Sequence, residues 1–285
     1  MRADSQARNV ALDEELVTGL TKADLIGLPS ALGAWDKAVI YGNGCHTAWS
    51  SSAVRPCVFG DPKSSHTVVI SGDSHAAHMQ PALAKWAQMR NWRLISITKT
   101  GCPLVDVHVI KAEESKLALG LPYPECDAWR AKAIAKINAI RPDAVVLPLL
   151  SRRGLSEPGK LKAWQRGINT TVRALSAANV VVLGDDPQVG RDMPSCLRRS
   201  QDPRKCIIPW DRAIHPERLS AERDAAIAAG ATFHDISTWF CVPQKGCPAV
   251  AGGKVIRRDD NHLAAAFARR IWPRIDTVVG PLATP

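Results

Sequence analysis

The sequence lacks the long apolar run of a membrane-spanning helix. No stretch approaches the roughly 18 uninterrupted apolar residues that such a helix requires. Residues 1–5 also contain no apolar core of the kind found in secretory signals. We therefore expect a soluble domain, and we expect any targeting segment of the natural protein to lie outside this sequence.

Aromatic residues other than tryptophan are scarce, and no zinc-finger spacing of cysteine and histidine occurs. The chain has two tyrosines and four phenylalanines against nine tryptophans. Its net charge of +10 favours an anionic partner, such as a polysaccharide or phospholipid headgroups. The Arg pairs are dispersed along the chain and form no basic block, so we do not expect nucleic acid as a partner.

The sequence also contains no Cys-x-x-Cys motif, although it has eight cysteines. An even number of cysteines, in segments rich in proline, glycine and charge, indicates disulfides formed in an oxidising compartment. Zinc is the alternative, because His46 lies beside a cysteine, but no pair has the spacing of a zinc knuckle. We expect no metal and no cofactor. The predicted disulfides join neighbours in sequence: Cys45 with Cys57, Cys102 with Cys126, Cys196 with Cys206, and Cys241 with Cys247.

Short apolar runs alternate with amphipathic segments through the middle of the chain. Strands are expected at 68–71, 93–97, 143–150, 179–184 and 231–236. Helices are expected between and after them, at 76–91, 128–140, 160–178, 219–229 and 263–272. This alternation predicts an α/β fold, a three-layer α/β/α sandwich with a five-stranded parallel sheet. Residues 1–60 are expected to form an N-terminal extension that packs on the main domain, residues 61–285.

Ser74 is the first candidate nucleophile. It follows the apolar run 68–71 and a glycine that permits a sharp turn, and it precedes a helix predicted from about Ala76. A strand that turns into a helix in this way holds a hydroxyl at the carboxyl edge of the sheet, beside amides that favour negative charge. In the alternative, Ser74 is only a helix N-cap.

His262 is the candidate general base, because Asp259 precedes it by three residues just before a predicted helix. Residues three apart on a turn lie on one side, so Asp259 can accept from Nδ1–H of His262 and leave Nε2 for Ser74. A serine nucleophile needs both a base and a group that orients the base. In the alternative, an Asp or Asn caps the helix and the imidazole is solvated.

Weaker candidates surround these residues. His75 and His78 lie one helical turn apart and either line the cleft or form a pair on the helix surface. Asp185 and Asp186 follow the fourth predicted strand, where they either cap a loop or contact substrate.

Two motifs resemble those of the SGNH (GDSL-type) hydrolases. Gly72-Asp73-Ser74-His75 is similar to block I of that family, and Asp-Asp-Asn-His at 259–262 is similar to block V, which also lies near the end of the chain. More closely, the chain resembles the SGNH domain fused behind the membrane acyltransferase-3 domain of bacterial cell-surface acyltransferases. Further similar stretches follow the same order, at 57–61, 100–103 and 258–263. The resemblance spans about residues 45–275 and implies a flavodoxin-like fold of the SGNH type.

The resemblance also implies roles for the matching residues. Ser74 would be the nucleophile, His262 the general base and acid, and Asp259 the group that orients His262. The implied function is O-acyl transfer, with acetyl as the expected group, to a cell-envelope glycan or glycolipid. A carbohydrate O-acyl esterase and a catalytically weak glycan-binding module are the alternatives.

The oxyanion hole is the least complete part of this resemblance. It would use the backbone amides of Ser74 and Gly101, although Gly101 also suits an ordinary turn. The family at large has Gly-x-Asn-Asp after the third strand, whereas residues 147–153 contain no asparagine. Ser151 or Arg152 is the candidate replacement donor, and a solvated loop is the alternative.

The resemblance finally implies a place and a partner. We expect an extracytoplasmic domain, periplasmic or on the outer face of the membrane. It would be tethered through an N-terminal membrane domain of the same polypeptide that delivers the acyl group. We expect the domain to be a monomer.

Overall fold

A mostly parallel sheet forms the centre of the computed structural model, which describes residues 2–22, 36–109, 122–150 and 159–283. Its five main strands lie in the order β4-β3-β5-β6-β7 and are parallel. This is the doubly wound order in which ligands bind at the carboxyl ends of the strands. The strands are β3 (Thr67–Gly72), β4 (Arg93–Lys99), β5 (Ala144–Pro148), β6 (Asn179–Leu183) and β7 (Thr232–His234).

Two further strands lie on the outer edge of β4, so the prediction of exactly five strands is wrong while the α/β/α fold class is confirmed. β1 (His46–Thr47) runs parallel to the end of β4, and β2 (Cys57–Gly60) runs antiparallel to its beginning. Both come from a segment with the cysteine and proline content of a loop. Strands this short are specified by their partner strand, because their own sequences carry no periodic signal.

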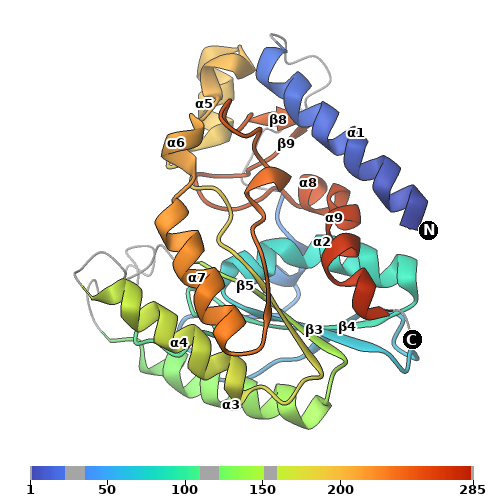
Figure 1. Ribbon diagram of the computed structural model, residues 1–285, viewed down its shortest axis with the longest axis vertical. Helices are drawn as coiled ribbons and strands as arrows, with labels where there is room; N and C mark the ends of the chain where they lie inside the picture. Colours follow the sequence, from blue (N-terminus) through green and yellow to red (C-terminus); the bar gives the residue numbers. More distant parts are fainter. Residues whose placement is uncertain (1, 23–35, 110–121, 151–158, 284–285) are drawn as a thin grey trace.

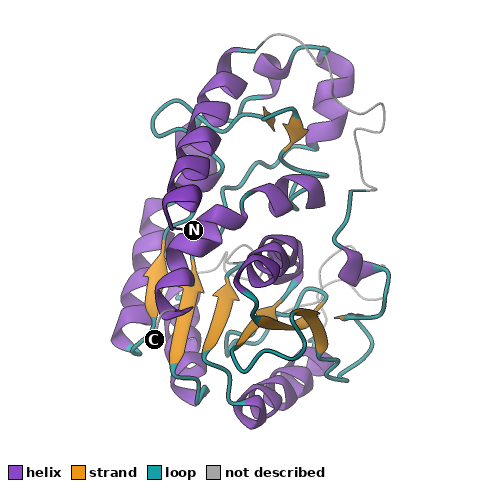
Figure 2. Cartoon of the chain, turned by 90° about the vertical axis from the view of Figure 1, so that its right-hand side faces the viewer, coloured by secondary structure: helices purple, strands orange, loops and turns teal. Residues whose placement is uncertain are grey.

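Helices cover both faces of the sheet, as Figures 1 and 2 show. Alternate residues of β3 point to opposite faces, so Val69 packs in one apolar cluster while Val68 and Ile70 pack in the other. One layer contains α3 (Pro124–Ile140), α4 (Lys160–Ala174) and α7 (Pro216–Ala228). The other layer contains α2 (Ser74–Arg90), α8 (Ala265–Arg270) and α9 (Trp272–Val278).

Smaller elements extend the layer of α2. α5 (Met193–Ser200), α6 (Trp210–Ala213) and the hairpin of β8 (Val250–Ala251) and β9 (Lys254–Val255) lie beyond the sheet at the top of Figure 1. Short 3-10 helices occur at Val39–Tyr41, Pro203–Cys206, Ser237–Trp239 and Gly280–Ala283. The helices among the described residues include none that is both long enough and apolar enough to cross a membrane.

α1 (Arg2–Thr21) packs along α9 and the β8 strand, with Leu12 and Leu16 buried in the larger apolar cluster. β1 and β2, which also precede residue 60, belong to the main sheet. The division at residue 60 therefore stays a prediction, and the segments before it are attached in two different ways.

Four disulfides tie loops to this framework, in the pairing expected from the order of the cysteines. Short closed loops of this kind contribute about 2 to 3 kcal/mol each by restricting the unfolded chain. The bond after β4 joins the loop at the carboxyl edge to α3. The pairs are Cys45–Cys57, Cys102–Cys126, Cys196–Cys206 and Cys241–Cys247.

Glu222 is a buried acid at the contact of α7 with α4. Its Oε1 accepts from Nε1 of Trp164 at 3.0 Å. Burial, with the nearby charge of Asp185, raises the pKa of Glu222 from 4.5 to about 8. A carboxyl with a raised folded-state pKa favours folding at low pH, and this contribution is lost as the pH rises from about 4.5 to about 8.

Glu222→Gln keeps an oxygen that can accept from Trp164, but its side chain cannot ionise. We therefore expect this variant to lack the loss of stability between pH 4.5 and pH 8. The free energy of unfolding, measured with urea between pH 5 and pH 8, should fall less steeply with pH than in the wild type. Glu217→Gln, at an exposed position of the same helix, is the matched control and should leave the slope unchanged. Equal slopes for Glu222→Gln and the wild type would contradict the prediction.

Candidate active site

Ser74 is the first residue of α2, and the residue before it provides the helix cap. Gly72 ends β3 with a φ of 145°, a conformation that favours glycine. Asp73 is the N-cap, and its Oδ1 accepts from the backbone N–H of His75 at 2.8 Å. Because Asp73 makes the capping bond, the Ser74 hydroxyl is not the cap of this helix.

Gly101 lies at the same edge of the sheet as Ser74. Gly72 and Thr98 are paired in register on the adjacent strands β3 and β4, so both chains leave the sheet at the same level. Gly101 has a φ of 59°, and a Cβ there would lie 2.2 Å from the Trp49 ring. Both observations explain why this position is a glycine.

A buried lysine holds the loop that contacts Gly101. The Lys99 ammonium donates to the backbone carbonyls of Ala48, Trp49 and Ser51 at 2.7, 3.0 and 2.7 Å. It therefore draws the segment that carries Trp49 over the end of β4. Lys99 could not be predicted from the sequence as a buried residue, because a lysine at the end of a predicted strand is normally exposed.

Asp259 and His262 form the expected pair. Nδ1 of His262 lies 2.9 Å from Oδ2 of Asp259, and Oδ1 of Asp259 also accepts from the backbone N–H of Asn261 and of His262. The side chain of His262 is 12% exposed, so the alternative of a solvated imidazole does not describe this ring. Nε2 is the ring nitrogen that remains for another partner.

The electrostatic surroundings favour a neutral His262 beside an ionised Asp259. Burial lowers the pKa of His262 below 6.5, more than the carboxylate of Asp259 raises it. Burial alone would raise the pKa of Asp259, but hydrogen bonds from His262 and the charge of Arg258 lower it well below its ordinary range. The pair therefore has the charge state of a base and its orienting group at neutral pH.

The segment 258–262 lies against the first turn of α2. The ring centroid of His262 is 6.1 Å from that of His75 and 6.0 Å from that of His78. Tyr41 links the two segments, because its hydroxyl donates to the carbonyl oxygen of Ser74 and the Arg258 guanidinium lies 5.1 Å above its ring. The structure thus brings His262 close to the helical turn that begins with Ser74, although most of the sequence separates the two.

A buried ion-pair network lies behind this contact, and the sequence analysis did not predict it. Nδ1 of His75 lies 2.8 Å from Asp186 and 3.2 Å from Asp185. Arg257 lies 2.6 Å from the other oxygen of Asp186. His75, Asp186 and Arg257 are almost completely buried, and we call these three residues the buried ion network.

The network holds the segment that carries His262. Burial alone would lower the pKa of His75, but Asp186 and Asp185 raise it to about 10, so both ring nitrogens are protonated at neutral pH. Its Nε2–H then donates to Oδ1 of Asn261 at 3.2 Å. Arg257 donates to the backbone oxygen of Asn261 at 2.9 Å. Asn261 is therefore held from two sides, directly before His262.

His75, His78 and Asp186 also place potential metal-ligand atoms within 4.8 Å of one another. Arg257 lies 2.6 Å from one oxygen of Asp186, and Nδ1 of His75, which is protonated at neutral pH, lies 2.8 Å from the other. A ring nitrogen that carries a proton cannot bind a metal. We therefore interpret this cluster as a set of ion pairs, and the expectation of no metal stays a prediction.

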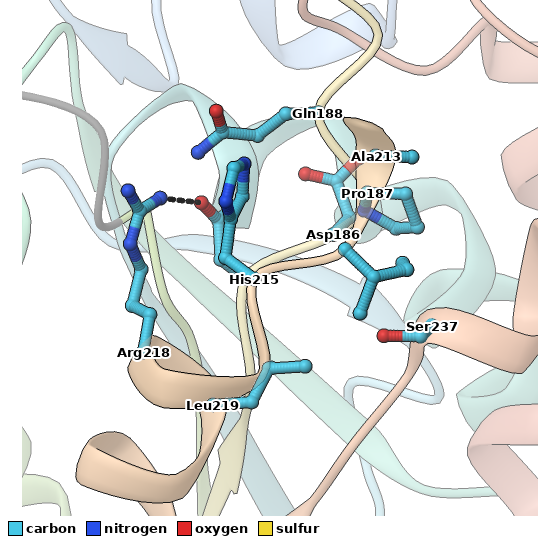
Figure 3. A pocket seen from close by; sticks show the side chains of 10 residues that line it. Asp186, Pro187, Gln188, Ala213, His215, Arg218, Leu219 and Ser237 are labelled. Carbon is cyan, nitrogen blue, oxygen red and sulfur yellow. Dashed lines mark ion pairs between the residues drawn. The ribbon is translucent and has the colours of Figure 1, made fainter. Parts of the chain in front are cut away.

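A small cavity lies on the other side of the two aspartates (Figure 3). Arg218 borders it, 4.0 Å from Asp185, and Leu219 and Ser237 form part of its wall. Its volume of about 10 Å³ has room for about one water molecule. The cavity is too small for a substrate, so the two aspartates do not line a binding cleft there.

Ser151 and Arg152, the candidates for a third oxyanion donor, lie outside the described residues. They stay predictions. Of the expected oxyanion groups, Ser74 and Gly101 are the ones that the structure describes, and both follow strands at the same edge.

Comparison with known proteins gives two matches. The family model described as "SGNH domain (fused to AT3 domains)" matches residues 44–277. Among solved structures, the periplasmic domain of the lipopolysaccharide acetyltransferase of Salmonella ser. Paratyphi A is similar. The TM-score is 0.58 and the identity 16%, over 76% of this chain and 83% of that chain, so this likeness shows the fold alone. Among curated proteins, no relative matches the chain at a significant level.

We expect the histidines of this region to titrate in different ways. In a ¹⁵N NMR titration of the imidazoles, His75 should stay protonated up to about pH 10. His78 and His262 should both be mostly neutral at pH 6.5, because burial lowers their pKa values. Asp186→Asn removes the main charge that raises the pKa of His75, so His75 should lose its proton at a lower pH.

The matched control is Asp127→Asn, which disrupts the pair of Asp127 with the exposed His108. It should leave the titration of His75 unchanged. Because the folded-state pKa of His75 is raised, its ion pairs stabilise the fold fully below pH 6.5, and this contribution is lost as the pH rises towards 10. A wild-type His75 that loses its proton below pH 6.5 would contradict the network.

Proposed function

The chain belongs to the SGNH domains that are fused to AT3 domains, and on this basis we propose that it transfers an O-acyl group through an acyl-enzyme on Ser74. The observation that carries the proposal is the 2.9 Å contact of His262 Nδ1 with Asp259. This contact favours the tautomer of His262 that carries its proton on Nδ1, which leaves Nε2 able to accept a proton. The ring of His262 lies 6.1 Å from that of His75, the neighbour of Ser74.

In the first half of the reaction, Oγ of Ser74 bonds to the carbonyl carbon of the acyl donor while Nε2 of His262 takes the hydroxyl proton. The carbonyl electron pair moves to oxygen and gives a tetrahedral oxyanion. Asp259 stabilises the imidazolium through Nδ1–H. When the bond to the leaving group breaks, His262 returns the proton to that group and the acyl-enzyme remains.

The oxyanion would accept hydrogen bonds from the backbone amides of Ser74 and Gly101. The amide of Ser74 opens α2, where the helix dipole favours negative charge. The positive φ of Gly101 turns the chain just after β4, as a backbone donor at this edge requires. Each well-aimed donor contributes about 3 to 4 kcal/mol to the transition state.

In the second half, a sugar hydroxyl of an envelope glycan or glycolipid attacks the acyl-enzyme and gives its proton to His262. The tetrahedral intermediate then collapses, Ser74 regains its proton, and the acylated sugar leaves. Fusion to AT3 domains in this family supports transfer, with acetyl as the expected group. With water in place of the sugar, the same residues would act as a carbohydrate O-acyl esterase.

The proposed membrane partner and the proposed cellular location both rest on the membership of this chain in the family. We infer that an N-terminal membrane acyltransferase domain of the same polypeptide delivers the acyl group and tethers this domain. The four disulfides support an oxidising, extracytoplasmic location. We also propose that the domain is a monomer, and that residues 1–60 form an extension packed on a catalytic domain of residues 61–285.

We expect Ser74→Ala to lower kcat for p-nitrophenyl acetate by about 10³-fold or more, because it removes the nucleophile. Ser71→Ala is the matched control, since the Ser71 hydroxyl donates to a carbonyl inside the sheet, three residues before the site. It should keep kcat within about threefold of the wild type. Circular dichroism would check that both variants fold.

Undiminished turnover in Ser74→Ala would overturn the acyl-enzyme. A fluorophosphonate should label the wild type on Ser74 and leave the variant unlabelled. An unlabelled wild type that still binds glycan would instead favour the glycan-binding module.

The acid limb of kcat/KM should lie below pH 6.5, because burial lowers the pKa of His262 and only its neutral form accepts the proton. In Asp259→Asn, the carboxylate that raises the pKa of His262 is absent, so the limb should move further down. The same variant should lose about 10⁴-fold in kcat through loss of the tautomer. A wild-type limb above pH 6.5 would contradict the assignment of His262.

Transfer and hydrolysis can be separated by products. With p-nitrophenyl acetate and a glycan acceptor, mass spectrometry should detect acylated sugar whose yield rises with acceptor concentration. Free acetate alone at every acceptor concentration would favour the esterase.

A further inference from the structure

A groove whose charged side chains are mostly basic runs beside α2. It consists of two cavities of about 330 and 350 Å³ that share Lys85 of α2 and Arg269 of α8, and therefore adjoin. Volumes of this size are typical of sites for small molecules or single sugar units. The first cavity lies where α1 packs beside α8 and α9 (Figure 1), and the second lies between α2 and β2. We call these two cavities the basic groove.

The charged side chains that line the basic groove are almost all positive. Its lining contains one carboxylate, Glu15, which pairs with Arg270. The cationic side chains are Arg8, Lys85, Lys254, Arg269 and Arg270. Neighbouring cations repel one another, so such a lining gains stability from a bound anion.

Three of these cations have no carboxylate partner among the residues that the structure describes. Arg8 pairs with Asp4, but Lys85 donates only to the neutral amide oxygen of Gln88, at 3.2 Å. Lys254 and Arg269 are exposed at the surface and form no ion pair within the described part of the chain. Their charges remain available to a ligand.

The rest of the lining suits a sugar better than a nucleic acid. Gln80 and Gln88 add amide groups that can bond to hydroxyls, and Pro81 and Phe59 supply apolar surface. The aromatic surface is too limited for a row of stacked bases.

The groove lies on the helix that begins with the proposed nucleophile. Lys85 is about 16 Å along α2 from Ser74, at 1.5 Å per residue. This separation is close to three full turns of an α-helix, so Lys85 and Ser74 are on the same side of α2. A ligand in the groove is thus separate from the reacting atoms but within the span of a short glycan chain.

We propose that the basic groove binds the acidic groups, carboxylate or phosphate, of a saccharide, and that the acceptor glycan is therefore an acidic one. The part of this inference that concerns the acceptor rests on the proposed function. The binding itself does not, because no residue of the basic groove takes part in the chemistry at Ser74. Lys85 and Arg269 would hold the acid group, since both cavities share them.

Binding should be measured by calorimetry in the Ser74→Ala background, where no turnover occurs. Oligogalacturonate is the carboxylate probe, a phosphorylated oligomannose is the phosphate probe, and maltooligosaccharide of equal length is the neutral reference. At least one acidic probe should bind in low salt and weaken as salt rises, and the neutral one should not bind. The two acidic probes distinguish carboxylate from phosphate.

Lys85→Glu with Arg269→Glu should weaken the binding of the acidic probe by about tenfold or more. The matched control is Lys136→Glu with Arg166→Glu, which makes the same change of charge at exposed positions of α3 and α4 on the opposite layer. It should leave the affinity within about twofold. With Ser74 intact, the groove variant should hydrolyse p-nitrophenyl acetate at the wild-type rate.

Several outcomes would overturn the inference. Equal weakening in both double variants would mean that only the net charge of the protein attracts the probe. Binding of phosphatidylglycerol vesicles through Lys85 and Arg269, without binding of either acidic saccharide, would assign the groove to a lipid surface. Loss of p-nitrophenyl acetate turnover in the groove variant would contradict the separation of the groove from the reacting atoms, on which the inference depends.

Failure of this inference is distinguishable from failure of the proposed function. If neither acidic probe binds but Ser74→Ala abolishes turnover, the groove proposal is wrong and the acyl-enzyme stands. If acidic saccharides bind but the wild type has no turnover, the acidic acceptor fails with the proposed function and the binding groove remains.

Discussion

The protonated ring of His75, held between Asp186 and Asp185 in the interior, is the interaction on which the rest of the site depends. Buried charges are tolerated only where each has a close partner. Asp186 meets this requirement by pairing with both His75 and Arg257. Removing one partner from a buried pair typically costs about 3 to 5 kcal/mol. The network therefore has few alternative arrangements, and it joins the start of α2, the loop after β6 and the segment before His262.

This constraint turns a local motif into a site. Asp259 and His262 can pair wherever their turn forms, since they are three residues apart. Their position relative to α2 depends on Asn261, which accepts from His75 through its side chain and from Arg257 through its backbone. The proposed base, His262, is thus held by the residue next to the proposed nucleophile Ser74. The rings of His262 and His75 lie 6.1 Å apart but differ in charge. Asp186 and Asp185 raise the pKa of His75, whereas burial lowers the pKa of His262 more than Asp259 raises it.

The carboxyl edge of the sheet adds a second layer of support. Lys99 is buried and bonds to three carbonyl oxygens, which places Trp49 against Gly101. Further along the same helix as Ser74, Lys85 meets Arg269 of α8 where the two cavities of the basic groove adjoin. α2 therefore connects the proposed chemistry at its first turn with the proposed binding of acidic sugar near its end.

Local patterns were enough to predict much of the fold. The alternation of apolar runs with amphipathic segments gave the α/β/α sandwich, and the order of the cysteines gave the four pairs. The turn after β3 singled out Ser74, and the three-residue spacing singled out Asp259 with His262. The short strands β1 and β2 escaped prediction, because their pairing with β4 and not their own composition makes them strands.

The sequence by itself therefore determined the fold class, the proposed nucleophile and the Asp259–His262 pair, since each depends on residues close together in the chain. Only the tertiary structure decided that Asp73 caps α2, and that His75, Asp186 and Arg257 form one buried network. These last three residues are each separated by many tens of positions, so the local patterns that marked His75 and Asp186 as candidates did not show that they pair with each other and with Arg257. Their charges become interdependent only when folding removes them from water, because pairing is then what makes their burial tolerable.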